Sequence, residues 1–196
     1  MSVSRETGER LEIYSALLRK WNPAINLVAP STLDDLQQRH LADCLQLTEL
    51  VEQPQGHWLD IGSGGGLPGI VLAAAWADRD LRVSLVESDS RKCAFLRSVI
   101  RELSLPKVTV HACRIEDLSP QNADYLSARA LAPLDKLLPF LQRHLAPQGE
   151  AWLLKGRRWQ QEADEAAKHW HFRYEAFTSK TDPEAAILNV RDIAHA

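Results

Sequence analysis

The glycine-rich segment from Asp60 to Gly69 constrains the fold of this chain more than any other stretch, and it reads Asp-Ile-Gly-Ser-Gly-Gly-Gly-Leu-Pro-Gly. It follows the apolar run His57–Ile61, which predicts a strand, and it leads into Pro68–Ala77, which predicts a helix of small residues. Glycines allow a tight turn and bring bare backbone N–H groups against a ligand. The spacing Gly-x-Gly-x-x-Gly that begins at Gly64 matches the dinucleotide-binding pattern in this context of strand, turn and helix.

Strand and helix patterns alternate through the rest of the chain, which indicates βαβ units and a mainly parallel sheet. The predicted strands are Leu81–Glu87, Lys107–Ala112, Asp124–Ala130 and Ala151–Lys155, and the predicted helices are Ser90–Leu103 and Leu134–Leu145. Phe172–Phe177 and Ile187–Ile193 are predicted to close the sheet as an antiparallel hairpin. The expected fold class is therefore α/β, a Rossmann-like, doubly wound sheet.

The first 55 residues read as helices instead. Apolar residues at helical spacing predict an amphipathic helix over about residues 8–20, which we expect Asn22-Pro23 to end. A second helix is predicted to begin near Ser31-Thr32, with two aspartates in its first turn. We expect residues 1–196 to form a single domain, with a helical cap over 1–55 and a Rossmann-like core over 56–196.

Composition excludes several classes of protein. With 196 residues, 45% hydrophobic and 25% charged, the chain is typical of one globular domain. A formal net charge of −3 argues against a protein that coats nucleic acid by bulk charge, but it permits a local basic site. The three cysteines include no Cys-x-x-Cys pair, so we expect no disulfide framework, no metal site and a cytoplasmic location. The apolar stretches are too short to span a bilayer.

Three positions around the glycine-rich segment predict an adenosine-type cofactor. Glu87 ends the second predicted strand, at the spacing of an acid that accepts hydrogen bonds from ribose hydroxyls. Cys113–Asp117 follows the third predicted strand, where an adenine ring would lie. Asp60 suits a ligand with a cationic end, such as the amino acid part of S-adenosylmethionine, and Asp-x-Gly-x-Gly resembles a motif of Rossmann-like methyltransferases.

Each of these features also has a plainer interpretation. The glycines can serve only as a tight joint between strand and helix, and Glu87 can be a solvated acid at the end of a strand. Arg129 can form a structural ion pair with Asp60 or Asp124. His40 and Asp43 stand one helical turn apart, so they can pair with each other and link the cap to the sheet.

Further motifs narrow the interpretation. Lys20-Trp21-Asn22, Asn26-Leu27 and Arg39-His40-x-x-Asp43 precede the glycine-rich segment, and Ser127-Ala128-Arg129-Ala130 and Leu154-Lys155-Gly156 follow it. In this order and spacing, over nearly the whole chain, they resemble the bacterial 16S rRNA guanine-N7 methyltransferase family, also called glucose-inhibited division protein B.

The resemblance implies a class I methyltransferase fold, S-adenosyl-L-methionine as cofactor, and transfer of one methyl group to N7 of a guanine in the 530 loop of 16S rRNA. It implies cofactor contacts at Gly62, Leu67, Ile115, Glu116 and Arg129. The cofactor-binding residues expected from the motif and the resemblance together are Asp60, Gly62, Ser63, Gly64, Leu67, Glu87, Ile115, Glu116 and Arg129.

The chemistry of guanine N7 agrees with these residues. N7 is a lone-pair nucleophile without a proton, so no general base is required, and catalysis depends on positioning and electrostatics. No catalytic residue is assigned; Arg129 is the nearest candidate, holding either the cofactor carboxylate or guanine O6. The segment around Arg129 lacks the Asn/Asp-Pro-Pro-aromatic motif of amino-group methyltransferases and the cysteine nucleophile of C5-pyrimidine methyltransferases.

Basic residues supply candidates for RNA contact. The RNA-binding candidates are Arg39, His40, Lys155, Arg157 and Arg158. The segment from Asp182 to Ile187 departs from the family by lacking a basic residue, and Trp159 and Trp170 are expected on one polar helix. The expected partners are 16S rRNA and the 30S subunit, with no membrane, and the expected state is a monomer. The alternatives are methylation of a small molecule, a non-catalytic S-adenosylmethionine-binding regulator and, last, an NAD-dependent dehydrogenase.

Overall fold

A computed structural model describes residues 3–196 of the chain. The strands are β1 (Gly56–Ile61), β2 (Leu81–Glu87), β3 (Val108–Ala112), β4 (Ala123–Arg129), β5 (Leu145–Lys155), β6 (Trp170–Thr178) and β7 (Ala186–His195). The α-helices are α1 (Arg5–Ile25), α2 (Ala42–Leu45), α3 (Leu47–Leu50), α4 (Gly69–Ala75), α5 (Ser90–Glu102), α6 (Leu134–His144) and α7 (Trp159–Ala166). Short 3₁₀ or π turns form η1 (Pro30–Thr32), η2 (Leu36–Leu41) and η3 (Ile115–Asp117).

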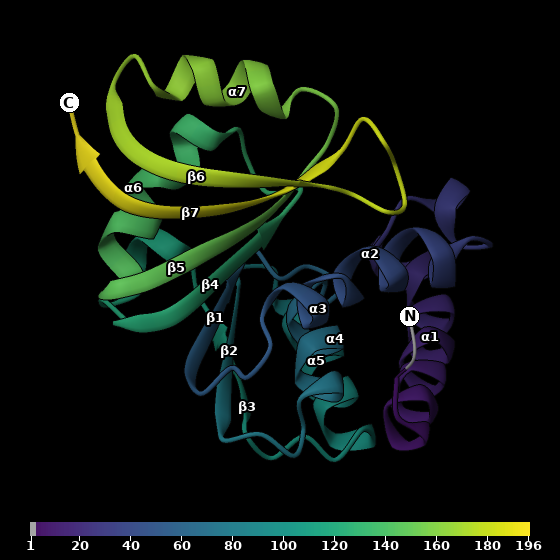
Figure 1. The fold of residues 1–196 in the computed structure, drawn as a ribbon. Coiled ribbons are helices and arrows are strands. Elements are labelled where there is room, and N and C mark those ends of the chain that lie inside the picture. The colour runs from purple at the N-terminus through teal and green to yellow at the C-terminus, as the bar shows by residue number, and fades with distance from the viewer. Residues whose placement is uncertain (1–2) are drawn as a thin grey trace.

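The strands form one seven-stranded sheet in the order β3-β2-β1-β4-β5-β7-β6 (Figure 1). The five strands from β3 to β5 are parallel, and β7 runs antiparallel to both β5 and β6. From β1 the chain runs outward to β2 and β3 on one side of the sheet and then returns to form β4 on the other side of β1. The order of the strands therefore reverses between β1 and β4, and open α/β sheets bind ligands at such a switch point. The predicted fold class is confirmed, with the C-terminal hairpin at one edge.

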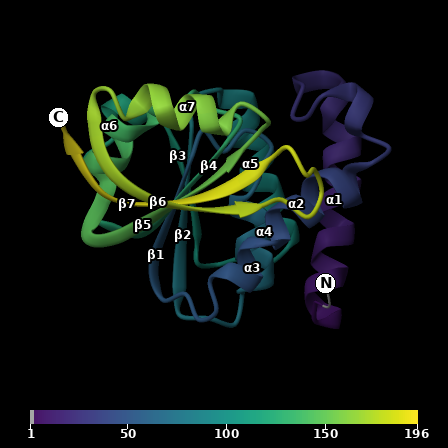
Figure 2. The same ribbon diagram turned by 45° about the horizontal axis from the view of Figure 1, so that its top comes forward.

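Hydrophobic residues cover both faces of the sheet. One buried cluster joins the sheet to α1, α3, α4 and α5, and a second joins it to α6 and α7. The helices of the N-terminal cap belong to the first cluster, because α1 packs on α4 and α5. Figure 2 shows the loop between β6 and β7 reaching across to α2, so a C-terminal loop meets the N-terminal cap beside the sheet. Of the helices in residues 3–196, none is long and apolar enough to cross a membrane.

The expectation that Pro23 ends the first helix is wrong, because α1 continues through it to Ile25. A proline in the last turn removes one backbone donor, and the end of the helix is set elsewhere. Asn26 adopts a left-handed backbone with φ 56°, and its N–H bonds the carbonyl of Asn22. The side-chain oxygen of Asn22 then accepts the backbone N–H groups of Leu27 and Val28 at 2.7 and 2.8 Å.

The second predicted helix is broken rather than continuous, which corrects the start expected near Thr32. That residue lies in η1, and the next helical turn begins only at Leu36, as the π-helical η2, followed by α2 and α3. The Thr32 hydroxyl donates to the Ala29 carbonyl at 2.8 Å and contacts His40, so it is not free to cap a helix. π-Helical turns occur frequently at functional sites, and η2 carries Arg39 and His40.

Two smaller expectations also change. Strand β5 begins at Leu145 rather than Ala151, because Leu145 pairs with Ala123 before a shift in register. Trp170 lies in β6 and not on the same helix as Trp159; it is buried, with its ring 4.9 Å from the ring of His195. The other predicted strands and helices of the core agree with the structure to within about two residues at each end.

Candidate cofactor and substrate site

A cavity of about 1860 Å³ opens at the carboxyl ends of β1, β2, β4 and β5. Its walls come from distant parts of the chain: the cap, the glycine-rich turn with the end of β2, η3, the loop after β4 with α6, the end of β5, and the loop between β6 and β7. Of the expected cofactor residues, Gly62, Ser63, Gly64, Leu67, Glu87, Ile115, Glu116 and Arg129 line this cavity. The fold therefore brings together residues that are separated by up to 67 positions in the sequence.

The glycine-rich turn uses the backbone freedom of its glycines. Gly62, Gly64 and Gly66 have φ values of 64°, 55° and 90°, a region that side chains disfavour. A β-carbon at Gly62 would lie 2.5 Å from the Leu131 side chain, and one at Gly66 would lie 2.5 Å from Ile70. One at Gly64 would have its nearest neighbour at 3.8 Å, so the backbone at that position faces open space.

Glu87 lies beside the turn, as its place at the end of β2 predicts. Its Oε2 accepts the backbone N–H of Gly64 at 2.9 Å, and its Oε1 accepts the N–H of Asp89 at 2.8 Å. These bonds fix the carboxylate at the cavity wall. Each oxygen keeps a second lone pair that a ligand hydroxyl can use.

Asp60 lies below the turn and is absent from the cavity wall, and its contact with the cationic end of a ligand stays a prediction. It is fully buried, and its Oδ1 accepts the Ser127 hydroxyl at 2.6 Å, while Ser127 accepts the Trp58 indole N–H at 2.8 Å. Oδ2 has no hydrogen-bond partner among the described residues. Burial raises the Asp60 pKa to about 6, against the opposing effect of the Ser127 hydroxyl.

The segment after β3 forms the short helix η3 at the cavity. Ile115 is buried with an apolar surface toward the site, whereas Glu116 is exposed and pairs with Arg114 at 3.5 Å. Backbone hydrogen bonding and the Arg114 charge lower the pKa of Glu116. A flat apolar ring can lie here with a charged group at its rim.

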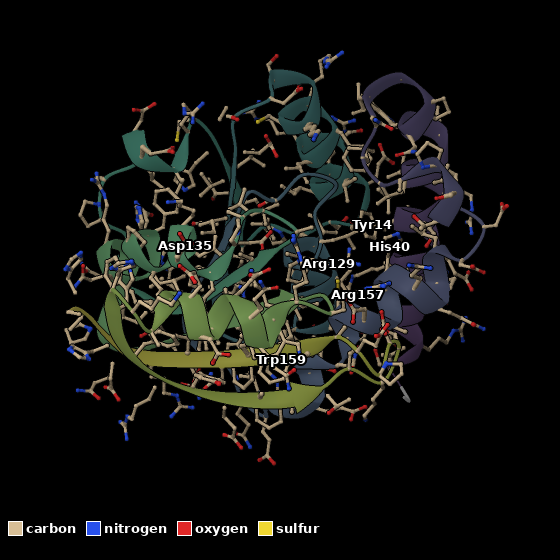
Figure 3. All side chains as sticks on the ribbon, turned by 90° about the horizontal axis from the view of Figure 1, so that it is seen from above. Tyr14, His40, Arg129, Asp135, Arg157 and Trp159 are labelled. Atoms are coloured by element: carbon tan, nitrogen blue, oxygen red, sulfur yellow. The ribbon has the colours of Figure 1, made fainter. Side chains whose placement is uncertain are left out.

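Arg129 ends β4 and points from the sheet toward the cap. Its Nε donates to Asp43 Oδ2 at 3.3 Å, and its Nη2 donates to His40 Nδ1 at 2.9 Å. Figure 3 shows Arg129 between the sheet and the cap, with His40 on the cap side. The expected link between cap and sheet is present, but it runs through Arg129 rather than directly between His40 and Asp43. Arg129 pairs with neither Asp60 nor Asp124, and Asp124 instead accepts the His57 N–H at 2.8 Å.

Comparison with known proteins agrees with this geometry. A family model described as GidB, rRNA small subunit methyltransferase G, matches residues 7–186. The chain belongs to this family. The ribosomal RNA small subunit methyltransferase G of Paracoccus denitrificans is 56% identical over 196 residues, which is 100% of both chains. That of Ruegeria sp. is 50% identical over 98% of this chain and 94% of the relative.

Solved structures of low sequence identity share the fold. A SAM-dependent methyltransferase from Aquifex aeolicus superposes with a TM-score of 0.61 at 16% identity, over 92% of this chain and 97% of that one. A variant of MtNAS in complex with S-adenosylmethionine has a TM-score of 0.64 at 16% identity, over 95% of this chain and 76% of that one. The cofactor of this methyltransferase G family member is S-adenosylmethionine, and the open space at Gly64 and the fixed Glu87 carboxylate fit it.

The candidates for RNA contact separate into two groups. Arg39, Arg157 and Arg158 are exposed, and within residues 3–196 they form no ion pair. Lys155 instead has a side chain only 8% exposed, which donates to the Ala132 carbonyl at 2.8 Å and pairs with Glu162 at 2.7 Å. His40 has both ring nitrogens engaged by protein. The structure thus gives Lys155 and His40 partners within the protein at the cavity wall, and their contact with RNA stays a prediction.

Sequence reasoning missed several residues that this methyltransferase uses to build the site. Leu131 is a 40% exposed leucine over Gly62, and the buried Tyr14 hydroxyl donates to the Gly65 carbonyl at 2.5 Å. Ser179 and Thr181, in the loop between β6 and β7, both donate to Asp43. No local sequence pattern predicts these contacts, because the two partners lie between about 50 and 140 residues apart in the chain.

Proposed function

We propose that this protein transfers a methyl group from S-adenosylmethionine to N7 of a guanine in the 530 loop of 16S rRNA, acting as a monomer on the 30S subunit in the cytoplasm. The observation that carries the proposal is the cavity, whose size and lining suit a lone-pair acceptor beside the cofactor. Membership of the rRNA methyltransferase family and the names of close relatives support the choice of RNA as substrate.

The cavity volume supports two occupants. Sites for a single small molecule usually measure about 300–1,000 Å³, and this one is close to twice the upper figure. The glycine-rich turn, the end of β2 and η3 form the part that suits the cofactor. The remaining part, between the cap and the loop joining β6 to β7, is open to an acceptor base.

The titratable groups nearest Arg129 leave no free general base. His40 accepts from Arg129 at Nδ1, and the Asp43 carboxylate accepts from Arg129 and from three other side chains. Across the cavity, the Glu87 carboxylate is held by two backbone N–H groups. An acceptor that must lose a proton before attack is poorly served here, whereas guanine N7 attacks with a lone pair and needs none.

The residues of the chain then act by binding and positioning. We infer that Glu87 accepts the ribose hydroxyls, that Ile115 packs against the adenine, and that Arg129 binds the cofactor carboxylate. The cofactor supplies the electrophilic methyl group on its sulfonium. Leu131 and the turn limit water in the space between cofactor and acceptor, where the positive charge passes from the sulfonium sulfur to the guanine as the methyl moves.

The face around the cavity mouth suits an RNA backbone. Arg39 lies at the cap side of the cavity, and Arg157 and Arg158 follow the end of β5, whose Leu154 pairs with Arg129 of β4. Arginines recognise phosphate through two parallel hydrogen bonds. A few such contacts hold an RNA without a basic overall charge.

The test uses tritiated S-adenosylmethionine, the purified protein and 30S subunits that lack the modification, with premodified 30S subunits as the control. We expect label on N7 of one guanine in the 530 loop, and no label on the premodified subunits. Nuclease mapping and base analysis locate the label. Label at another nucleotide or atom contradicts the proposed specificity, and no label on any RNA contradicts the proposed substrate.

A further inference from the structure

Four side chains form a continuous hydrogen-bonded chain from the cap to the end of β4. The Thr32 hydroxyl lies 2.8 Å from the Ala29 carbonyl and 2.7 Å from His40 Nε2. His40 Nδ1 lies 2.9 Å from Arg129 Nη2, and Arg129 Nε lies 3.3 Å from Asp43. The chain passes along one wall of the cavity, which His40, Asp43 and Arg129 all line.

The direction of every hydrogen bond in this chain is determined. A guanidinium nitrogen only donates, so His40 Nδ1 must accept and its single proton must be on Nε2. Thr32 gives its hydroxyl proton to the Ala29 carbonyl and accepts from Nε2. His40 is thus a neutral imidazole in one tautomer, and burial together with the Arg129 charge lowers its pKa to about 4.

Asp43 fixes the same guanidinium from a second direction. Its Oδ2 accepts from Arg129 Nε, while its Oδ1 accepts from Gln46 in the cap and from Ser179 and Thr181 in the loop between β6 and β7, at 3.0–3.1 Å. A carboxylate with this many donors has little freedom to rotate. The cap, β4 and the C-terminal loop therefore meet at one side chain.

The two contacts use one edge of the Arg129 guanidinium and leave the other available. Nε and Nη2 face Asp43 and His40, and Nη1 with the second N–H of Nη2 has no hydrogen-bond partner in residues 3–196. That free edge presents two parallel N–H groups, the geometry that binds a carboxylate in a bidentate manner. The side chain is 19% exposed and lies at the cavity.

We propose that His40 and Asp43 are positioning residues that hold Arg129 with its free edge toward the carboxylate of S-adenosylmethionine. The inference rests on the proposed contact between Arg129 and the cofactor. It gives the helical cap a role in cofactor selection, since the residues that aim the arginine come from η2 and α2 rather than from the Rossmann-like core.

The experiment compares two ligands that differ in the group Arg129 would bind. S-adenosylhomocysteine carries the amino acid carboxylate, whereas 5′-methylthioadenosine lacks it. Dissociation constants are measured by calorimetry for the full-length protein and for His40→Ala, His40→Asn, Arg129→Met and His171→Ala. His171 is an exposed histidine on β6 and serves as the matched control.

We expect His40→Ala to weaken S-adenosylhomocysteine binding about tenfold and to leave methylthioadenosine binding unchanged, because a charge-assisted hydrogen bond that orients the arginine is removed. Arg129→Met gives the same pattern with a larger loss. His40→Asn restores most of the affinity, since its side-chain oxygen stands near the position of Nδ1 and accepts from Arg129. His171→Ala behaves as the unmodified protein.

Each contrary result identifies what fails. Equal losses for both ligands in His40→Ala mean that His40 only supports the fold, which overturns the inference. If Arg129→Met weakens only S-adenosylhomocysteine binding but His40→Ala does not, the inference about His40 is overturned. The proposed contact between Arg129 and the cofactor is then still supported. If Arg129→Met affects both ligands equally, both the contact of Arg129 with the cofactor carboxylate and the inference are contradicted. The labelling of 16S rRNA still decides the proposed function.

A further variant covers the case in which His40→Ala does not fold. Thr32→Val removes the acceptor of the Nε2 proton, so the imidazole loses one of the two hydrogen bonds that orient it toward Arg129. We expect a loss of about threefold in affinity for S-adenosylhomocysteine alone. Unchanged affinity in a folded Thr32→Val protein contradicts the proposed positioning of Arg129 through His40.

Discussion

At the scale of single residues, Asp60 is an acid that the glycine-rich motif predicts to bind the cofactor and that the fold buries beneath the turn. The carboxyl is fully buried, with the Ser127 hydroxyl on one oxygen and no partner on the other within residues 3–196. Burial in a medium of low polarity disfavours its ionised form. Its position under the glycine-rich turn makes it a support for the backbone that the cofactor approaches.

Replacing Asp60 by asparagine should stabilise the cofactor-free protein at pH 7. A pKa raised from 3.8 to about 6 means that stability is lost as pH rises from about 4 to 6, because the unfolded carboxyl ionises first. Asparagine avoids that loss and still accepts from Ser127, so we expect a gain on the order of 3 kcal/mol. Urea unfolding at pH 4 and pH 7 measures it, with exposed Asp164→Asn as control. An equal stability of the two proteins at pH 7 contradicts the prediction.

Two glycines of the turn should respond differently to alanine. At Gly64 the new methyl enters open space beside the cofactor, so we expect a folded protein with at least about tenfold weaker cofactor binding and a backbone cost of about 1–2 kcal/mol. At Gly66 the methyl would lie 2.5 Å from Ile70, so thermal stability should fall further. Calorimetric titration and melting curves test both. Similar melting temperatures for Gly64→Ala and Gly66→Ala rule out this distinction.

At the scale of elements, α1 contributes to the site although no residue of this helix lines the cavity. Tyr14 is fully buried and donates its hydroxyl to the carbonyl of Gly65, while a β-carbon at Gly65 would touch Leu27 at 3.3 Å. The cap therefore fixes the turn from behind. Burial raises the Tyr14 pKa well above its ordinary value, so the hydroxyl keeps its proton and remains a donor.

Tyr14→Phe should loosen this attachment without changing the shape of the core. The buried Gly65 carbonyl loses its partner, which costs about 1–3 kcal/mol of unfolding free energy, and cofactor affinity falls because the turn is less ordered. Chemical denaturation and cofactor titration measure the two effects. Tyr174→Phe, at an exposed tyrosine of β6, is the control and should change neither. Unaltered cofactor affinity in Tyr14→Phe means that α1 does not order the turn.

At the scale of the whole molecule, the cavity exists because remote segments converge on the carboxyl edge of the sheet. The cap, the glycine-rich turn, η3, the loop after β4, the end of β5 and the loop between β6 and β7 all contribute to its walls. Arg39 lines the cavity, Arg157 and Arg158 follow the end of β5, and Lys155 fixes the wall at Ala132 from inside. We therefore expect residues inside the cavity to affect cofactor binding, and the exposed arginines outside it to affect RNA binding.

Arg157→Ala with Arg158→Ala should weaken 30S or RNA binding and flatten its dependence on salt, by about 0.7–0.9 in slope for each phosphate that is no longer bound. Cofactor affinity should be unchanged, because neither residue lines the cavity. Binding measured from low to physiological salt gives the slope. Arg82→Ala with Arg97→Ala removes two exposed arginines away from the mouth and is the matched control. An unchanged slope in the first pair places the RNA face elsewhere.

Local sequence patterns were enough to predict most elements and the glycine-rich turn, because hydrophobic period, proline and glycine act on their near neighbours in the chain. Alternating apolar runs predicted the strands, and Gly62, Gly64 and Glu87, which were predicted to bind the cofactor, line the cavity. The end of α1 and the start of the second helix were predicted less well. Pro23 lies in the last turn of α1, and the Thr32 hydroxyl contacts His40 instead of capping a helix. Those outcomes depend on tertiary contacts.

Which polar groups line the cavity and which bond to the protein interior depends on contacts between remote segments. Asp60 and Lys155 look like binding residues in sequence, but packing buries one and gives the other an internal partner. Asp43 gains its role because Arg129 and Ser179 reach it from 86 and 136 positions away. Hydrogen-bond partners at such separations are set by the topology of the sheet, which no local pattern of residues encodes.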